Sequence, residues 1–264
     1  METIVDESSR GCLPDFEEYM RVVAIIQART GSTRLPGKVL ADLAGEPMLA
    51  RVVNRTRRAK RLDEVVIATT IQPADDAIVK LCAARGWEYF RGSNDDVLDR
   101  YYQAAMKYHA QAIVRITSDC PFIDPEILDR VIEAFLDGQP EVDYISNAYP
   151  RFTFPRGLDT EVVRLNALEQ AWREDRNLAW REHVTSFILL NPSLFCLAGI
   201  LHDLDLSDMR WTVDTPDDLV FVRRIYDTFN HDRFSWRDVV SLLKKSPQWL
   251  DLNRHVQQKK DPGD

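Results

Sequence analysis

The chain has 264 residues, 45% of them hydrophobic, and a formal net charge of -8. This length and composition can bury one large core or two modest ones, so we expect a folded globular protein. The acidic balance disfavours binding of nucleic acid through a basic face but allows a local basic pocket. The four cysteines form no C-x-x-C pair, which argues against a disulfide framework or a thiolate zinc site.

The ends of the chain carry no targeting or membrane signal. Residues 1–20 form an acidic, polar extension without an apolar core, and no stretch approaches the roughly 18 apolar residues of a membrane span. We therefore expect a soluble, cytoplasmic protein with no membrane partner. We expect one domain over residues 21–245 and a C-terminal tail over 246–264, in which residues 254–264 are frayed.

Apolar, β-branched runs alternate with helical patterns along the chain. Strands are predicted at Val22–Ile26, Glu64–Thr69, Ala112–Ile116, Val142–Ser146, Leu194–Ile200 and Arg210–Val213. Helices are predicted at Ala74–Arg85, Asp95–Tyr108, from Asp124 to Gly138, and after the capping residues Thr215 and Ser235. This βαβ series predicts an α/β fold with a largely parallel sheet.

One stretch departs from this rhythm. Between Tyr149 and Leu190 an aromatic loop precedes helices near Asn166 and Trp180. We expect residues 149–200 to form an inserted lobe that contacts a substrate or a second subunit.

The loop after the first predicted strand combines glycines, hydroxyls and cations. It carries Gly31 and Gly37, which permit close backbone approach and positive φ, and the hydroxyl donors Ser32 and Thr33. Three fixed positive charges come from Arg29, Arg34 and Lys38. At the carboxyl edge of a parallel sheet, such a loop predicts a triphosphate site. An ordinary turn with solvated cations is the simpler alternative.

The loop is not a Walker motif. Pro36 stands where that motif needs a glycine, and Val39 stands where Ser or Thr would hold magnesium. A P-loop kinase or ATPase is therefore disfavoured.

Two aspartates follow predicted strands at the same edge. Asp119 comes after the strand ending at Ile116, and Asp214 comes after Trp211-Thr212-Val213. Carboxylates placed beside a triphosphate site suit a divalent cation. Taken singly, Asp119 could form an Asx turn and Asp214 could neighbour the cap of the next helix. Together with the cationic loop they predict a metal site.

Six blocks in order resemble a known family. They are Ile26-Gln27-Ala28-Arg29 through Leu35-Pro36-Gly37-Lys38, Gly45-Glu46-Pro47-Met48, Arg91-Gly92-Ser93 with Asp96-Val97-Leu98-Asp99-Arg100, Ser118-Asp119-Cys120-Pro121, Gly157-Leu158-Asp159-Thr160-Glu161-Val162, and Trp211 to Leu219. Over residues 21–245 the chain resembles the cytidylyltransferases typified by CMP-KDO and CMP-sialic acid synthetases, and more closely their spore-coat polysaccharide branch. The resemblance implies a single Rossmann-like, GT-A-like nucleotidyltransferase domain with three α/β/α layers and a mostly parallel mixed sheet.

The resemblance also assigns roles to residues. Arg29, Lys38, Asp119 and Asp214 would be catalytic, and the two aspartates would hold Mg²⁺. The nucleotide would contact Gln27, Ala28, Arg29, Gly31, Ser32, Arg34, Lys38, Ser93 and Arg100. The acceptor would contact Arg156, Asp159, Glu161, Arg181 and His183, in the 149–200 lobe. A homodimer is implied, as in related enzymes. Ser118 departs from the family, which commonly has glycine before the first metal aspartate.

The function implied is transfer of CMP from CTP to an acidic sugar, phosphate or phosphonate, with release of pyrophosphate, in surface polysaccharide or related biosynthesis. One alternative is a glycosyltransferase that uses a nucleotide sugar, but such enzymes usually rely on an Asp-x-Asp pair after a strand. Asp203-x-Asp205 is a poor candidate because it lies among leucines. A second alternative is a nucleotide-binding protein with weakened catalysis, which Ser118 makes conceivable.

Overall fold

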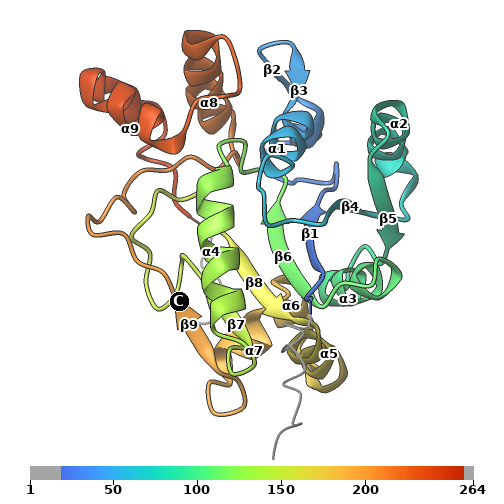
Figure 1. The fold of residues 1–264 in the computed structure, drawn as a ribbon. Coiled ribbons are helices and arrows are strands. Elements are labelled where there is room, and N and C mark those ends of the chain that lie inside the picture. Colours follow the sequence, from blue (N-terminus) through green and yellow to red (C-terminus); the bar gives the residue numbers. More distant parts are fainter. Residues whose placement is uncertain (1–18, 259–264) are drawn as a thin grey trace, which may run out of the picture.

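The computed structural model describes residues 19–258, so residues 1–18 of the expected extension and 259–264 of the expected tail lie outside the description (Figure 1). A seven-stranded sheet has the order β5-β4-β1-β6-β8-β7-β9. Its strands are β1 (Val22–Gln27), β4 (Glu64–Thr70), β5 (Glu88–Gly92), β6 (Ala112–Thr117), β7 (Tyr144–Ser146), β8 (Glu161–Arg164) and β9 (Leu197–Gly199).

The sheet is mixed but mostly parallel, as predicted. Strands β5, β4, β1 and β6 run parallel, β8 is antiparallel to both β6 and β7, and β9 is parallel to β7. Two short strands, β2 (Asp42–Leu43) and β3 (Glu46–Pro47), form a separate hairpin. The carboxyl ends of the four parallel strands therefore meet at one edge of the sheet.

Helices cover both faces of the sheet, which confirms the three-layer architecture (Figure 1). One face packs against α3 (Val97–Lys107), α5 (Leu165–Glu174) and α7 (Ser186–Leu190). The other packs against α1 (Met48–Thr56), α2 (Asp76–Arg85), α4 (Pro125–Asp137), α8 (Pro216–Phe229) and α9 (Trp236–Lys245). Strand β1 is buried on both faces, because Val22, Ala24 and Ile26 point to one core and Val23 and Ile25 to the other.

The predicted helix starts are confirmed in detail. Asp124 caps α4 by accepting a hydrogen bond from the Glu126 amide. Helices α8 and α9 each begin with a capping box, formed by Thr215 with Asp218 and by Ser235 with Asp238. In each box the side chain of either residue accepts a hydrogen bond from the backbone amide of the other. A short helix, α6 (Leu178–Glu182), and a 3₁₀ segment, η3 (Pro247–Leu252), complete the chain.

One predicted strand is wrong. Residues 210–213 make a single isolated bridge, between Arg156 and Arg210, within the described chain. The segment is apolar, but apart from this bridge it belongs to no strand of the sheet. The sequence also fails to predict β5, because its partly exposed residues Glu-Tyr-Phe-Arg-Gly make no apolar run.

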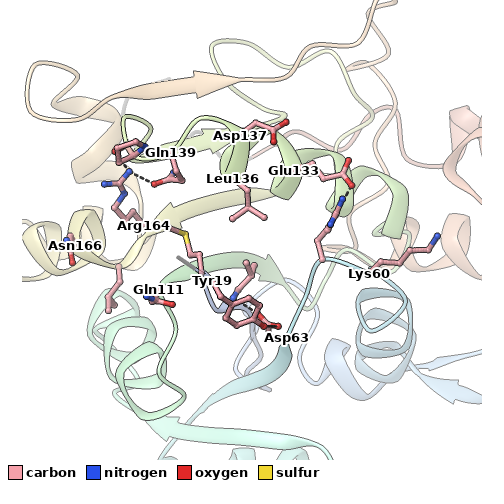
Figure 2. Close-up of a pocket in the computed structure, with 15 residues that line it drawn as sticks. Tyr19, Lys60, Asp63, Gln111, Glu133, Leu136, Asp137, Gln139, Arg164 and Asn166 are labelled. Carbon is pink, nitrogen blue, oxygen red and sulfur yellow. Dashed lines mark hydrogen bonds and ion pairs between the residues drawn. The ribbon is translucent and has the colours of Figure 1, made fainter. Parts of the chain in front are cut away.

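A cavity of about 1140 Å³ lies at the opposite edge of the sheet (Figure 2). Val22 and Gln111, at the amino ends of β1 and β6, line it together with Arg164 at the end of the antiparallel β8. This lining shows that the cavity is separate from the carboxyl edge. Several charged groups in the cavity are paired with one another, such as Arg61 with Glu133 at 2.8 Å.

No helix within residues 19–258 has the length and apolar character needed to cross a membrane.

A buried arginine fastens α1 to the segments around it. The Arg55 guanidinium is fully buried and donates to the carbonyls of Ile123 (2.7 Å), Asp232 (2.7 Å) and Phe234 (3.0 Å). These contacts join α1 to the start of α4 and to the α8–α9 connection.

We expect Arg55→Ala to lower the free energy of unfolding by about 3 to 5 kcal/mol, because several buried carbonyls would lose their donor. Urea unfolding measures this change. Arg58→Ala, which removes a partly exposed arginine that also contacts Asp232, is the matched control and should cost about 1 kcal/mol or less. Equal losses in the two variants would contradict this role for Arg55.

Candidate active site

The loop that follows β1 folds back on itself before a 3₁₀ turn, η1 (Lys38–Leu40). The Thr30 carbonyl accepts hydrogen bonds from the amides of Ser32 and Gly37, both at 2.9 Å. Gly37 has φ of 70°, as the sequence predicts, and initiates η1. Gly31 does not have a positive φ, and a Cβ there would meet nothing within 4 Å. The conformational role predicted for Gly31 is therefore not required by the loop.

A buried carboxylate anchors this loop from the next strand. Asp75 ends the 3₁₀ turn η2 (Pro73–Asp75) after β4, and its Oδ1 accepts from the Thr30 amide and hydroxyl, both at 2.7 Å. Its other oxygen accepts from the Thr70 hydroxyl. The sequence analysis missed Asp75, although an acidic residue just after a strand at this edge was the available signal.

Lys38 lies between the two predicted metal aspartates. Its Nζ donates to Asp119 Oδ2 at 2.8 Å, to Asp214 Oδ1 at 2.9 Å and to the Val213 carbonyl at 2.8 Å. All three ammonium protons are thereby used in a position only 9% exposed. Burial lowers the pKa of Lys38, but the two carboxylates outweigh it and the net pKa is raised. Lys38 is therefore a fixed positive charge.

The backbone brings the two aspartates together. The Val213 amide donates to the Asp119 carbonyl at 2.8 Å, which ties the segment before Asp214 to the turn after β6. Gly157 packs against the same segment: its φ is +104°, and a Cβ there would lie 2.8 Å from the Thr212 nitrogen. These contacts fix the spacing of the two aspartate backbones, and the contacts of the side chains then set the position of each carboxylate.

Two arginines complete the charge balance at Asp214. Its Oδ2 contacts Arg34 at 2.9 Å and Arg210 at 2.8 Å. Burial raises the pKa of Asp214, but Lys38, Arg210 and Arg34 together hold the net pKa below its ordinary value. Arg210 is a second residue that the sequence analysis missed, because it was placed in a predicted strand.

A cleft of about 320 Å³ lies above this cluster, at the carboxyl edge. Apart from Ser93, every predicted nucleotide-binding residue lines it: Gln27, Ala28, Arg29, Gly31, Ser32, Arg34, Lys38 and Arg100. Ser93 instead holds Arg100, through its carbonyl. Ser118, Asp119 and Asp214 also line the cleft. The cleft thus joins the cationic loop to both aspartates.

Two polar atoms in the cleft wall have no partner among the described residues. They are Gln27 Oε1, an acceptor, and Arg100 Nε, a donor, and both atoms are buried. Arg100 as a whole is only 1% exposed. Buried polar atoms usually find a hydrogen bond, and either water or a bound ligand could supply the partner of each of these atoms.

The predicted acceptor residues behave differently. Within the described chain, the lining of this cleft includes none of Arg156, Asp159, Glu161, Arg181 and His183; Glu182 lines it instead and pairs with Arg29 at 3.2 Å. Arg181 is 8% exposed and bonds Asp96 and two backbone carbonyls. Glu161 bonds Arg115, Tyr144 and Thr185. These contacts favour structural roles for Arg181 and Glu161.

The other three acceptor candidates have distinct surroundings. The Arg156 guanidinium stacks on the Phe152 ring at 3.3 Å from its centroid. Burial raises the pKa of Asp159 to about 6, against the lowering effect of Arg156 and the Gly157 amide. His183 is the C-terminal cap of α6, next to Glu182.

The carboxylate pair fits a divalent cation that also binds phosphate. Residues 19–258 contain no cluster of three or more His, Cys, Asp or Glu side chains placed to hold a metal. Asp119 and Asp214 nevertheless already share one small cation, the Lys38 ammonium, at 2.8 and 2.9 Å. Mg²⁺ is typically bound through one or two carboxylates plus substrate phosphates, so two are sufficient.

Comparison with known proteins shows the family of this chain. The sequence profile of the family described as Cytidylyltransferase matches residues 23–232. The chain belongs to the cytidylyltransferase family. It is a CTP-dependent nucleotidyltransferase by that membership. The matched range contains the cationic loop and both aspartates.

Relatives cover nearly the whole chain. The spore coat polysaccharide biosynthesis protein SpsF of Bacillus subtilis is 35% identical over 237 residues, which is 86% of this chain and 95% of SpsF. A solved cytidylyltransferase from Leptospira borgpetersenii is 33% identical, with a TM-score of 0.85 over 92% of this chain and all of that one. A CMP-KDO synthetase solved with CTP shares the fold, with a TM-score of 0.61 over 79% of this chain and 99% of that one, at 21% identity.

We expect Asp75→Ala to release the Thr30 amide, since Asp75 is its acceptor. Hydrogen exchange at Thr30 should accelerate by about tenfold or more. Asp76→Ala removes a neighbouring, half-exposed carboxylate that binds Arg91 instead, and it should leave Thr30 exchange unchanged. Unaltered exchange in Asp75→Ala would show that the loop is anchored by other contacts.

Proposed function

We propose that this cytidylyltransferase transfers CMP from CTP to an acidic sugar, phosphate or phosphonate, with release of pyrophosphate, in surface polysaccharide or related biosynthesis. The observation that carries the proposal is the contact of Lys38 with both Asp119 and Asp214 at the base of a cationic cleft. This contact supports the proposal because cations suited to a triphosphate lie beside carboxylates suited to a metal.

The reaction is an in-line displacement at the α-phosphorus of CTP. An acceptor oxyanion forms the new bond to phosphorus as the bond to pyrophosphate breaks, and the electron pair leaves with pyrophosphate. Such a displacement depends mainly on positioning and on neutralising charge. Arg29, Arg34 and Lys38 lie where they can offset the charge that builds on the leaving group. An acceptor that is already ionised needs no strong base.

Asp119 and Asp214 are the proposed ligands of a Mg²⁺ ion. A related structure of Rv0371C from Mycobacterium tuberculosis was solved with manganese, although at 15% identity it shares only the fold. When bound, the ion would polarise phosphate oxygens as a Lewis acid. The role of the protein is to hold the two carboxylates on one side of the cleft and the cations of the loop on the other.

The unpaired atoms in the cleft wall are compatible with cytosine. Its exocyclic amine can donate to an acceptor such as Gln27 Oε1, and its ring nitrogen and carbonyl can accept from a donor such as Arg100 Nε. Adenine and uracil also offer a donor and an acceptor, so these two atoms suit a nucleobase in general, and the choice of CTP rests on membership of the cytidylyltransferase family.

The acceptor is proposed to bind beyond the cleft, towards the 149–200 lobe. Arg156 supplies a cation and Asp159 a partly buried carboxyl, and both come from one loop that packs on the Asp214 segment. Glu182 joins this group because it spans the cleft to Arg29. An acidic acceptor agrees with the relative named 3-deoxy-manno-octulosonate cytidylyltransferase in Trichlorobacter lovleyi, which is 42% identical over 123 residues, 46% of this chain and 47% of that one. The homodimer remains a prediction.

We expect pyrophosphate release with CTP and an acidic acceptor, and little with ATP, GTP or UTP. A coupled pyrophosphate assay with each nucleotide and a panel of acidic sugars, phosphates and phosphonates measures this. Asp119→Asn should reduce turnover by about a thousandfold, since it removes a charge that neutralises the ion at the reacting phosphate.

The matched control is Asp217→Asn, an exposed carboxylate near Asp214 that binds His255, and its rate should stay near that of the unsubstituted protein. Turnover with UTP or ATP but never with CTP would refute the base assignment. Binding of CTP without any turnover would support the catalytically weakened alternative.

We expect Lys38→Met to increase the affinity of the nucleotide-free protein for Mn²⁺ by about tenfold, even though it impairs turnover. The ammonium lies between the two carboxylates, so a cation must displace it. Its removal leaves Asp119 without its ion-pair partner among the described residues and leaves Asp214 with Arg34 and Arg210. Electron paramagnetic resonance of free Mn²⁺ measures the binding. Arg29→Met removes a cation that pairs with Glu182 instead and should leave Mn²⁺ affinity unchanged. Weaker Mn²⁺ binding in Lys38→Met would contradict the competition.

A further inference from the structure

Asp218 is a fully buried carboxylate at the first turn of α8. Its Oδ2 accepts from the Asp214 amide at 3.0 Å and from the Thr215 amide at 2.9 Å. Its Oδ1 accepts from Arg210 Nε at 2.9 Å and from Asn253 Nδ2 at 3.0 Å. The Asp214 amide is therefore bonded to the Asp218 carboxylate, whose own position is fixed by hydrogen bonds from Arg210, Asn253 and the Thr215 amide.

Arg210 extends this network to the side chain of Asp214. Its Nη2 donates to Asp214 Oδ2 at 2.8 Å and to Asp218 Oδ2 at 3.1 Å. Burial raises the pKa of Asp218, but Arg210 and the Asp214 amide outweigh it, and the net pKa is lowered. Both members of the Arg210–Asp218 pair are therefore charged, in a position where Arg210 is 8% exposed. A planar guanidinium can bridge two carboxylates in this way, whereas an ammonium cannot do so with the same geometry.

Asn253 fastens the pair from the far end of the chain. It follows η3, is 2% exposed, and donates from Nδ2 to the Arg210 carbonyl at 2.9 Å as well as to Asp218. The family match ends at residue 232, so Asn253 lies outside it. The C-terminal segment thereby reaches the candidate site through two hydrogen bonds.

We propose that Asn253 is a positioning residue for Asp214, which acts through Asp218 and Arg210 to set the orientation of the Asp214 carboxylate. Arg210 holds Oδ2, and Oδ1 is left to face Lys38 and the cleft. The proposal rests on the proposed function, in which Asp214 is a metal ligand. Groups that orient a metal ligand typically change metal affinity by about 10- to 100-fold when they are removed.

The test compares Mn²⁺ binding by Asn253→Leu, Arg210→Lys and the double variant in the full chain. Paramagnetic resonance of free Mn²⁺ gives the affinity, and the pyrophosphate assay gives kcat and KM for CTP. We expect each single variant to weaken Mn²⁺ binding by about tenfold. Because both substitutions interrupt one chain of contacts, the double variant should lose little more than either single variant.

Asn147→Leu is the matched control for general loss of stability. Asn147 is 1% exposed, donates to the Leu158 carbonyl and accepts from the Thr160 amide. The substitution therefore removes a pair of buried hydrogen bonds similar to the pair that Asn253→Leu removes. It should lower the melting temperature comparably and leave Mn²⁺ affinity unchanged. A Mn²⁺ affinity in Asn253→Leu no weaker than in Asn147→Leu would overturn the proposal, as would full additivity in the double variant.

Asp214→Asn separates this proposal from the proposed function. If Asp214→Asn leaves Mn²⁺ binding unchanged, the metal site itself is wrong and the role of Asn253 fails with it. If Asp214→Asn weakens Mn²⁺ binding but Asn253→Leu does not, the metal site stands and only the positioning role is overturned.

Discussion

The contact of one ammonium with two carboxylates is the interaction on which the site depends. Asp119 and Asp214 come from segments far apart in the sequence, and without a shared cation their charges would repel at this separation. Lys38 contacts both, and Arg34 and Arg210 neutralise the remaining oxygen of Asp214. Arg210 is also paired with Asp218, so three cations face three carboxylates and the cluster is charge-balanced before any ligand arrives.

That balance makes ligand binding an exchange of partners rather than an addition of charge. A triphosphate offers Lys38 and Arg34 new anionic partners, and a divalent cation offers the carboxylates a replacement for the ammonium. Each exchange makes the other easier, because either alone would leave like charges facing one another. In the proposed function, nucleotide and metal therefore bind cooperatively. The buried backbone contacts around Val213 and Gly157 keep the two aspartate backbones in place during the exchange.

The sequence predicted the centre of this site because its residues follow apolar segments that end at one edge of the sheet. Lys38 lies in the loop after β1 and Asp119 follows β6, whereas Asp214 follows an apolar segment that the Val213 amide ties to Asp119. The sequence could not predict the roles of residues whose contacts depend on a partner from a distant part of the chain. Glu161 was interpreted as an acceptor ligand, but the sheet register sets Arg115 of β6 directly opposite it and satisfies its charge. Arg210 was taken as part of a strand, since an extended segment with one isolated bridge has the same local pattern as a strand.

Arg210 also connects the two sides of the candidate site. Arg210 forms an isolated β-bridge with Arg156. In this bridge the Arg156 amide donates to the Met209 carbonyl at 2.9 Å, and the Trp211 amide donates to the Arg156 carbonyl at 2.7 Å. The Arg210 carbonyl is held by Asn253, and the Arg210 side chain holds Asp214. A displacement of the Arg156 loop by an acceptor would therefore act on the same short segment that orients the metal ligand. In the proposed function, acceptor binding and metal geometry would be linked there by direct hydrogen bonds, without any need for a longer path through the core.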